Sequence, residues 1–173
     1  MTIERPNAFL VGDRKLTLVG PEMRPGDSAP DFSGIGQDWK PVTLASSAGR
    51  TRLFVVVPSL DTSVCDLEAR EFSRRADEID GVEIVVVSVD LPPAQARWCG
   101  AAGVRNLTLV SDHRDVSFGT GYGVLVKETR MLCRAILVVN AQDTVTYVEY
   151  VPQIGLQPDY DAAIAAARAA AAD

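Results

Sequence analysis

The sequence predicts an α/β fold with a central mixed β-sheet flanked by helices. Residues 53–57 are five consecutive apolar residues and residues 82–89 are mainly aliphatic, which is typical of strands covered on both faces. The amphipathic segment between them predicts a crossover helix, so the two strands should be parallel. Two short strands within residues 8–20, joined at a turn that contains Gly12, predict an N-terminal hairpin. With 173 residues, 47% of them hydrophobic, we expect a single domain over residues 1–173.

The crossover helix carries the first candidate site residue. Pro58 ends the strand before it, because proline cannot donate to a sheet and fixes its own φ. Asp61 or Thr62 can cap the helix, and either choice places Cys65 in its first turn. One apolar face is predicted from the helical spacing of Cys65, Ala69, Phe72, Ala76 and Ile79, whereas Glu68, Arg70, Glu71, Arg74, Arg75, Asp77 and Glu78 fill the other faces.

A thiol in the first turn of a helix lies near unpaired backbone N–H groups, which favour the nucleophilic thiolate. The acidic neighbours Asp61, Asp66 and Glu68 oppose that effect, so a cation from elsewhere in the chain is expected close to the sulfur. Cys65 is therefore a candidate nucleophile. The alternative is an ordinary buried cysteine on a helix face.

A second helix is expected after the strand at residues 82–89. Asp90 should cap it, Pro92 or Pro93 should occupy its first turn, and Gly100 should end it. Cys99 lies one residue before that expected end. Its position alone favours a core cysteine beside Trp98.

The remaining elements follow in order along the chain. Thr43 and Leu44 belong to a possible short strand, residues 108–111 to another, and residues 116–119 to a helical turn. Residues 131–140 and 145–150 should pair as neighbouring strands. A terminal helix over residues 160–171 follows from its many alanines and should cover one face of the sheet.

Arg134 lies within the apolar strand predicted at residues 131–140. Strand alternation places it on one face with Leu132, Ile136 and Val138, and places Cys133 on the other face, in the core. An arginine among aliphatic residues is costly to bury unless an anion faces it. The Cys65 thiolate is the candidate anion, and a structural carboxylate such as Asp61 is the alternative.

Composition excludes several classes of protein. The net charge is −6 and no run of Lys or Arg is present, so nucleic acid is not an expected partner. No stretch approaches the length of a membrane span, and residues 1–6 lack the apolar region of a secretory signal. Three cysteines are odd in number and too few for a disulfide scaffold, which favours a reducing compartment, the cytoplasm.

Neither a metal nor a cofactor is expected. Cys65, Cys99, Cys133 and the lone His113 are the candidate zinc ligands, but structural zinc sites gather their ligands in close pairs, which this chain lacks. His113 lies among charged residues of a loop, so it is expected to be exposed to solvent.

The site residues also carry a family resemblance. Pro58, Thr62 and Cys65 stand in the order P-x-x-x-T-x-x-C, which resembles the active-site signature of the peroxiredoxins. Arg134, in the segment CRAILVV, matches the arginine that this family places beside its reactive cysteine. The segments PSLDTSVCDLEAREF, VVSVDLPPAQARWCG and LVSDHRDVSFGTGYGVL resemble the thiol peroxidase subfamily of atypical two-cysteine peroxiredoxins along nearly the whole chain.

The resemblance implies a thioredoxin-like fold and an antioxidant enzyme that reduces hydrogen peroxide and organic hydroperoxides. Cys65 would be the peroxidatic cysteine and Cys99 the resolving cysteine, joined in an intrachain disulfide that thioredoxin reduces. Thr62 and Arg134 would hold the thiolate and the peroxide, and Pro58 would shield the sulfur. Many relatives form homodimers, so a homodimer is expected.

Disulfide formation sets a geometric requirement. Two formed helices are not expected to bring Cys65 and Cys99 together, so we expect one or both cysteine segments to unwind during turnover.

Two functions other than a peroxidase are also compatible with the sequence. A disulfide exchanger of the same fold would use Cys-x-x-Cys, and Thr62 occupies the position of its first cysteine. A non-catalytic peroxide sensor could use the same cysteine pair as a switch.

Overall fold

The computed structural model of the chain describes residues 2–172, so the two terminal residues of the expected domain, 1 and 173, lie outside the described residues. The strands are β1 (Glu4–Val11), β2 (Arg14–Val19), β3 (Gly34–Ile35), β4 (Pro41–Val42), β5 (Thr51–Val56), β6 (Val82–Ser88), β7 (Thr108–Ser111), β8 (Leu125–Val126), β9 (Ala135–Val139) and β10 (Val145–Tyr150). The α-helices are α1 (Ser63–Arg74), α2 (Pro92–Ala102), α3 (Ser117–Gly121) and α4 (Tyr160–Ala172). Two 3-10 helices, η1 (Leu44–Ser47) and η2 (Ala76–Ile79), complete the elements.

The central sheet is mixed, as the sequence predicts. Its strand order is β10-β9-β5-β6-β7-β3-β4. The pairs β5–β6 and β6–β7 are parallel, which confirms the crossover around α1. The pairs β5–β9 and β9–β10 are antiparallel, which confirms that residues 131–140 and 145–150 contain neighbouring strands.

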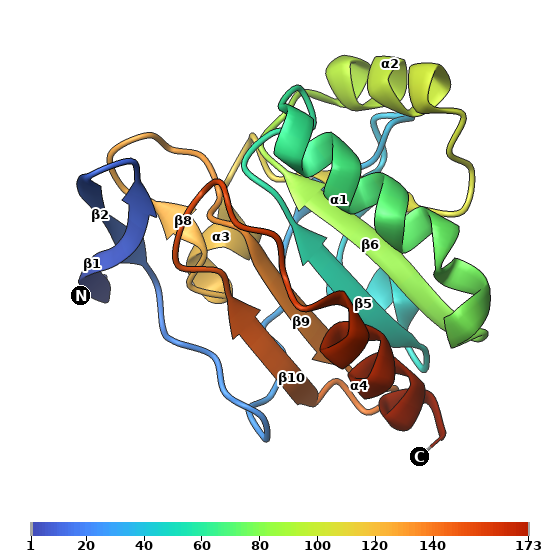
Figure 1. The fold of residues 1–173 in the computed structure, drawn as a ribbon. Coiled ribbons are helices and arrows are strands. Elements are labelled where there is room, and N and C mark those ends of the chain that lie inside the picture. Colours follow the sequence, from blue (N-terminus) through green and yellow to red (C-terminus); the bar gives the residue numbers. More distant parts are fainter. Residues whose placement is uncertain (1, 173) are drawn as a thin grey trace.

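Strand β5 is buried on both faces of the sheet, which explains the apolar run at residues 53–56. Leu53 and Val55 pack in one core cluster with residues of α1 and α4. Phe54 and Val56 pack in the second cluster, which includes residues of α3 and the N-terminal strands. Figure 1 shows α1 and α4 crossing the same face of the sheet. Cys65 therefore lies in the core between α1 and the sheet.

The N-terminal hairpin is present and longer than residues 8–20. Strands β1 and β2 pair antiparallel, and β2 also pairs with β8, which forms a separate three-stranded sheet. In Figure 1 this small sheet lies apart from the central one. No helix among residues 2–172 combines the length and apolar character needed to cross a membrane.

Two corrections concern helix α2. It continues past Gly100 and ends at Gly103, whose φ of 66° is the left-handed conformation typical of a residue that terminates a helix. Its N-cap is Leu91 rather than Asp90. The Asp90 carboxylate instead accepts hydrogen bonds from the Leu60 N–H at 2.8 Å and from two serine hydroxyls, those of Ser59 and Ser88.

Two further corrections concern short apolar segments. The strand expected at Thr43 and Leu44 is absent, because Leu44 begins the 3-10 helix η1 and the nearby strand is β4. Leu132 does not share a face with Arg134. Strand β9 begins only at Ala135, so alternation does not extend back to Leu132, which packs in the cluster on the opposite face of the sheet.

Candidate active site

The loop between β5 and α1 places Cys65. Pro58 follows the end of β5 and is buried. Thr62 is the N-cap of α1: its Oγ1 accepts the Cys65 N–H at 3.4 Å and donates to the Ser59 carbonyl at 3.1 Å. Cys65 consequently lies in the first turn of the helix, with only 1% of its surface exposed. The predicted placement of these residues is confirmed, and Thr62 rather than Asp61 is the cap.

Arg134 supplies the cation that the sequence leads us to expect. It precedes β9 and is fully buried. Its Nη2 donates to Cys65 Sγ at 3.5 Å and to the Ile154 carbonyl at 3.0 Å. This contact places a positive charge directly beside the Cys65 sulfur. Thr62, Cys65 and Arg134 thus come together from two distant parts of the chain.

Glu68 is a site residue that the sequence analysis missed. The helical spacing predicts a position outside the apolar stripe for Glu68, and the carboxylate expected near Arg134 is Asp61. In the structure Asp61 is exposed, whereas Glu68 is fully buried and its Oε2 accepts a hydrogen bond from Arg134 Nη1. The helical spacing could have predicted that Glu68 lies near the sulfur, because residues three apart on a helix share a face and Glu68 is three residues after Cys65.

Burial determines the protonation of Glu68. Desolvation raises its pKa to about 8, and the nearby positive charge of Arg134 offsets only part of that effect. Glu68 Oε1 and Arg134 Nε have no hydrogen-bond partner, so the pair is incompletely satisfied. Near neutral pH Glu68 is therefore mostly protonated, and the charge of Arg134 remains available to the sulfur of Cys65.

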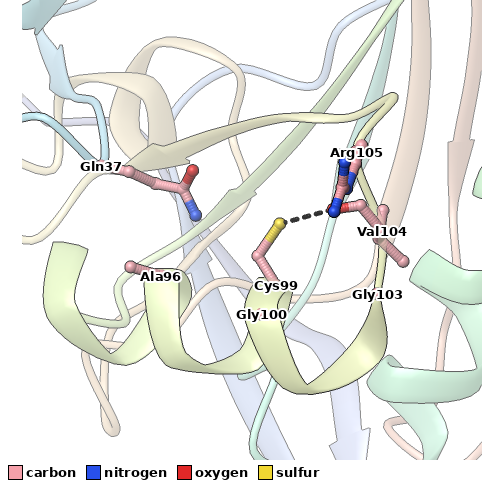
Figure 2. Close-up of a pocket in the computed structure, with 7 residues that line it drawn as sticks. All are labelled: Gln37, Ala96, Cys99, Gly100, Gly103, Val104 and Arg105. Atoms are coloured by element: carbon pink, nitrogen blue, oxygen red, sulfur yellow. Dashed lines mark hydrogen bonds between the residues drawn. The ribbon is translucent and has the colours of Figure 1, made fainter.

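Cys99 lies apart from this group of residues. It is half-buried near the end of α2, and its Sγ donates to the Val104 carbonyl at 2.9 Å. Figure 2 shows the sulfur directed into a pocket between Gln37 and Arg105. This pocket has a volume of about 260 Å³. Both Cys65 and Cys99 are free thiols within formed helices. The structure therefore describes the arrangement that precedes any disulfide.

The other candidate ligands lie away from the site. Cys133 is fully buried, as predicted, in the cluster on the opposite face of the sheet from Cys65, and burial raises the pKa of its thiol to about 12. His113 is half-buried rather than exposed, with Nδ1 2.7 Å from Ser111 Oγ. Within residues 2–172 no cluster of three His, Cys, Asp or Glu side chains could hold a metal ion.

Comparisons with known proteins agree with this geometry. The Redoxin family model matches residues 24–164. A thiol peroxidase of Halalkalibacterium halodurans is 54% identical over 90% of this chain and 93% of its own length, and one from Listeria innocua is 48% identical over 90% and 94%. The crystal structure of a peroxiredoxin-like protein from Aquifex aeolicus superposes with a TM-score of 0.88 at 33% identity, covering 94% of this chain and 96% of that one. The chain therefore belongs to the redoxin family and, within it, to the thiol peroxidases of the peroxiredoxin type.

Proposed function

We propose that this chain reduces hydrogen peroxide and organic hydroperoxides to water and alcohols, with Cys65 as the reacting thiol. The observation that carries the proposal is the contact between Arg134 Nη2 and Cys65 Sγ at 3.5 Å, inside a fully buried site at the start of α1. A buried cysteine with only aliphatic neighbours would be inert, whereas a guanidinium beside the sulfur favours the nucleophilic form. The curated relatives, which are thiol peroxidases, support the same activity.

In the first step the Cys65 thiolate attacks the nearer oxygen of the hydroperoxide. A sulfur–oxygen bond forms, the oxygen–oxygen bond breaks, and the leaving oxygen takes a proton and departs as water or alcohol, with Cys65 as a sulfenic acid. We propose that the Thr62 hydroxyl and the Arg134 guanidinium hold the two peroxide oxygens. Their hydrogen bonds stabilise the transition state most, because charge moves from sulfur to oxygen there. Pro58, buried beside this loop, limits access of water.

In the second step the Cys99 thiol condenses with that sulfenic acid, which gives a Cys65–Cys99 disulfide and releases one water. A disulfide requires the two Cα atoms to lie within about 7 Å. Cys99 donates to Val104 from within α2, and Cys65 lies in the first turn of α1. We therefore propose that one or both segments unwind before the sulfurs meet.

A dithiol protein of the thioredoxin type is the proposed reductant. Its two thiols supply the two electrons that convert the disulfide back to thiols, through a mixed disulfide. Cys99 is the more accessible of the two sulfurs, since it is half-buried whereas Cys65 is buried. This difference in exposure supports attack by the reductant's thiol on the Cys99 sulfur of the disulfide.

The proposal is tested by steady-state peroxide consumption with thioredoxin, thioredoxin reductase and NADPH. Cys65→Ser should abolish turnover, because no other described thiol contacts Arg134. Cys99→Ser should allow one round of Cys65 oxidation and then stop recycling through thioredoxin. The wild type should sustain many turnovers, whereas a peroxide sensor would react once and stall. Full activity of Cys65→Ser would overturn the assignment.

We further propose that the protein forms a homodimer beside the site. Leu67 on α1 is 60% exposed and Leu156 is 47% exposed. Gln157 Nε2 donates to the Val64 carbonyl at 3.2 Å, which places both leucines near the first turn of α1. Burial of these apolar side chains against a second copy would remove them from water. Light scattering should give the dimer mass for the wild type, and Leu67→Glu should shift it toward the monomer; a monomeric wild type at tens of micromolar contradicts the proposal.

A further inference from the structure

Three side chains connect the helices that carry the two cysteines. Asp66 follows Cys65 on α1, and Trp98 precedes Cys99 on α2. Trp98 Nε1 donates to Asp66 Oδ1 at 2.7 Å, and Arg70 Nε donates to the same oxygen at 2.8 Å. Arg70 also reaches the end of α2, where its Nη1 donates to the Ala102 carbonyl at 3.2 Å. The immediate neighbours of the two cysteines are thus joined directly.

The two halves of α2 are anchored differently. Pro92 and Gln95, in the first half, are the buried residues of this helix. Gln95 Nε2 donates to Ser88 Oγ at 3.1 Å and to the Val110 carbonyl at 3.0 Å, which ties the first half to the sheet. In the second half Trp98 and Cys99 are only half-buried. Both pack against the core cluster around α1 while remaining partly exposed, so the contacts made by Asp66 and Arg70 add to the attachment of this half.

The strength of these contacts suits a reversible attachment. The Asp66 and Arg70 side chains remain 32% and 44% exposed, so water competes for their hydrogen bonds and screens their charges. A carboxylate that accepts the indole N–H nevertheless gives a stronger hydrogen bond than a neutral acceptor would. The connection can therefore hold α2 in place and still break within a catalytic cycle.

We propose that Asp66, Arg70 and Trp98 form a latch that sets how fast Cys99 reaches the oxidised Cys65. Asp66 and Trp98 are positioning residues in this scheme, since neither touches the peroxide. Unwinding of the first turn of α1 displaces Asp66, which releases Trp98 and frees the second half of α2 together with Cys99. The inference rests on the proposed roles of Cys65 and Cys99.

The latch also determines the fate of the sulfenic acid. While α2 stays attached, Cys99 is held away and the Cys65 sulfenate remains open to a second hydroperoxide. That peroxide transfers one oxygen to sulfur, giving a sulfinic acid, and leaves as water or alcohol. Faster release of α2 favours the disulfide and protects Cys65 from this second oxidation.

Trp98→Phe tests the latch, because phenylalanine keeps an aromatic ring but lacks the N–H that binds Asp66. The peroxide concentration that converts half of Cys65 to sulfinic acid during turnover, measured by mass spectrometry, should rise about 5- to 10-fold, as expected for loss of one charge-assisted hydrogen bond. The rate of the first oxidation of Cys65 should stay within about 2-fold of wild type. General destabilisation would instead lower that first rate.

The matched control is Trp39→Phe, which changes the chain's other tryptophan, 55% exposed and between β3 and β4. It should leave the peroxide concentration for half conversion unchanged. Asp66→Asn provides a second variant: it keeps an acceptor for Trp98 but loses the charge that binds Arg70, so a smaller rise is expected. An unchanged value in both Trp98→Phe and Asp66→Asn, or an equal rise in Trp39→Phe, would overturn the latch.

Disulfide formation distinguishes failure of the proposed function from failure of the latch. If wild-type protein treated with peroxide forms no Cys65–Cys99 disulfide, the roles assigned to the two cysteines are wrong. If the wild type forms that disulfide and Trp98→Phe forms it at the same rate, only the latch is wrong.

Discussion

Arg134 divides its guanidinium between two acidic partners, and this division governs the chemistry of the site. Nη2 contacts the Cys65 sulfur and Nη1 contacts Glu68, with all three side chains buried. An ionised Glu68 would compete with the thiolate for the same positive charge. Because burial raises the pKa of Glu68 to about 8, that competition is weak near neutral pH.

Arg134→Met should therefore impair stability and catalysis for separable reasons. Loss of Arg134 leaves the buried Glu68 carboxyl without its hydrogen-bond donor, at a cost of about 2 kcal/mol in the free energy of unfolding. Oxidation of Cys65 should slow by about 100-fold, through loss of one charged donor. The double variant Arg134→Met with Glu68→Met, in which both partners become apolar residues of similar volume, should regain most of the stability but none of the rate. Urea unfolding and single-turnover peroxide kinetics measure both, and recovery of the rate in the double variant would contradict the role of Arg134.

Glu68 also predicts how stability depends on pH. Its folded pKa, about 8, lies above the ordinary value of 4.5, so between these values the folded state binds more protons than the unfolded state. Stability consequently falls as pH rises through this window, by up to about 1.4 kcal/mol per pH unit from this group. Burial also raises the pKa of Asp112, to about 6, so this group makes stability fall with rising pH only at lower pH values. Urea unfolding from pH 6 to 8 should show a flatter dependence for Glu68→Gln than for wild type; parallel curves would count against a buried, protonated Glu68.

At the scale of one element, the start of α1 combines structural and chemical roles. Thr62 Oγ1 accepts the backbone N–H of Cys65, so one hydroxyl caps the helix and binds the backbone of the residue that we propose reacts with peroxide. Thr62→Val keeps the shape but loses the hydroxyl. It should lower the free energy of unfolding by about 1 kcal/mol, the usual effect of losing a cap, and slow Cys65 oxidation by at least about 10-fold.

Thr62→Ser keeps the hydroxyl and removes only the methyl group, so it distinguishes the contributions of these two groups. Serine caps helices as well as threonine does, so stability should stay within about 0.5 kcal/mol of wild type and the peroxide rate should be largely retained. Chemical denaturation and stopped-flow kinetics on the two variants provide the comparison. Equal rates for Thr62→Val and Thr62→Ser would remove the hydroxyl from the mechanism.

The elements that the sequence predicts well are those governed by local periodicity. The apolar runs of β5 and β6, the stripe of α1 and the alanine-rich α4 each repeat one signal over several residues, and each element is present. Helix α1 ends earlier than the stripe predicts, at Arg74, so Ala76 and Ile79 lie in the 3-10 helix η2. The errors occur where a distant partner decides the outcome. Asp90 could cap α2 by sequence alone, but the Leu60 N–H and the hydroxyls of Ser59 and Ser88 bind its carboxylate instead.

For the whole molecule, long-range contacts account for what the sequence could not predict. The approach of Arg134 to Cys65 followed from the expectation that a buried arginine needs an anion, together with the family resemblance. Glu68 was missed because a glutamate next to arginines on an amphipathic helix is normally solvated, and only the packing of α1 against the sheet buries it. The pairing of β8 with the hairpin likewise joins segments far apart in sequence, and no local sequence pattern predicts it.

Cys133 lies on the opposite face of the central sheet from Cys65, so we expect its thiol to take no part in the peroxide chemistry. Cys133 lies in the cluster between the central sheet and the N-terminal strands, so opening around Cys65 does not expose it. With burial raising its pKa to about 12, its thiolate is scarce at neutral pH. Cys133→Ala should therefore leave peroxide turnover unchanged and lower the free energy of unfolding by only about 1 kcal/mol, the effect of a small cavity.

Labelling of the reduced protein with iodoacetamide tests the same arrangement. In native buffer Cys99 should react while Cys133 stays unmodified, and Cys133 should become labelled at the rate of global unfolding as urea is added. Mass spectrometry of the digested protein distinguishes the two positions. Labelling of Cys133 as fast as Cys99 without denaturant would mean that the core between the sheet and the hairpin opens locally, and the separation of Cys133 from the redox chemistry would then be lost.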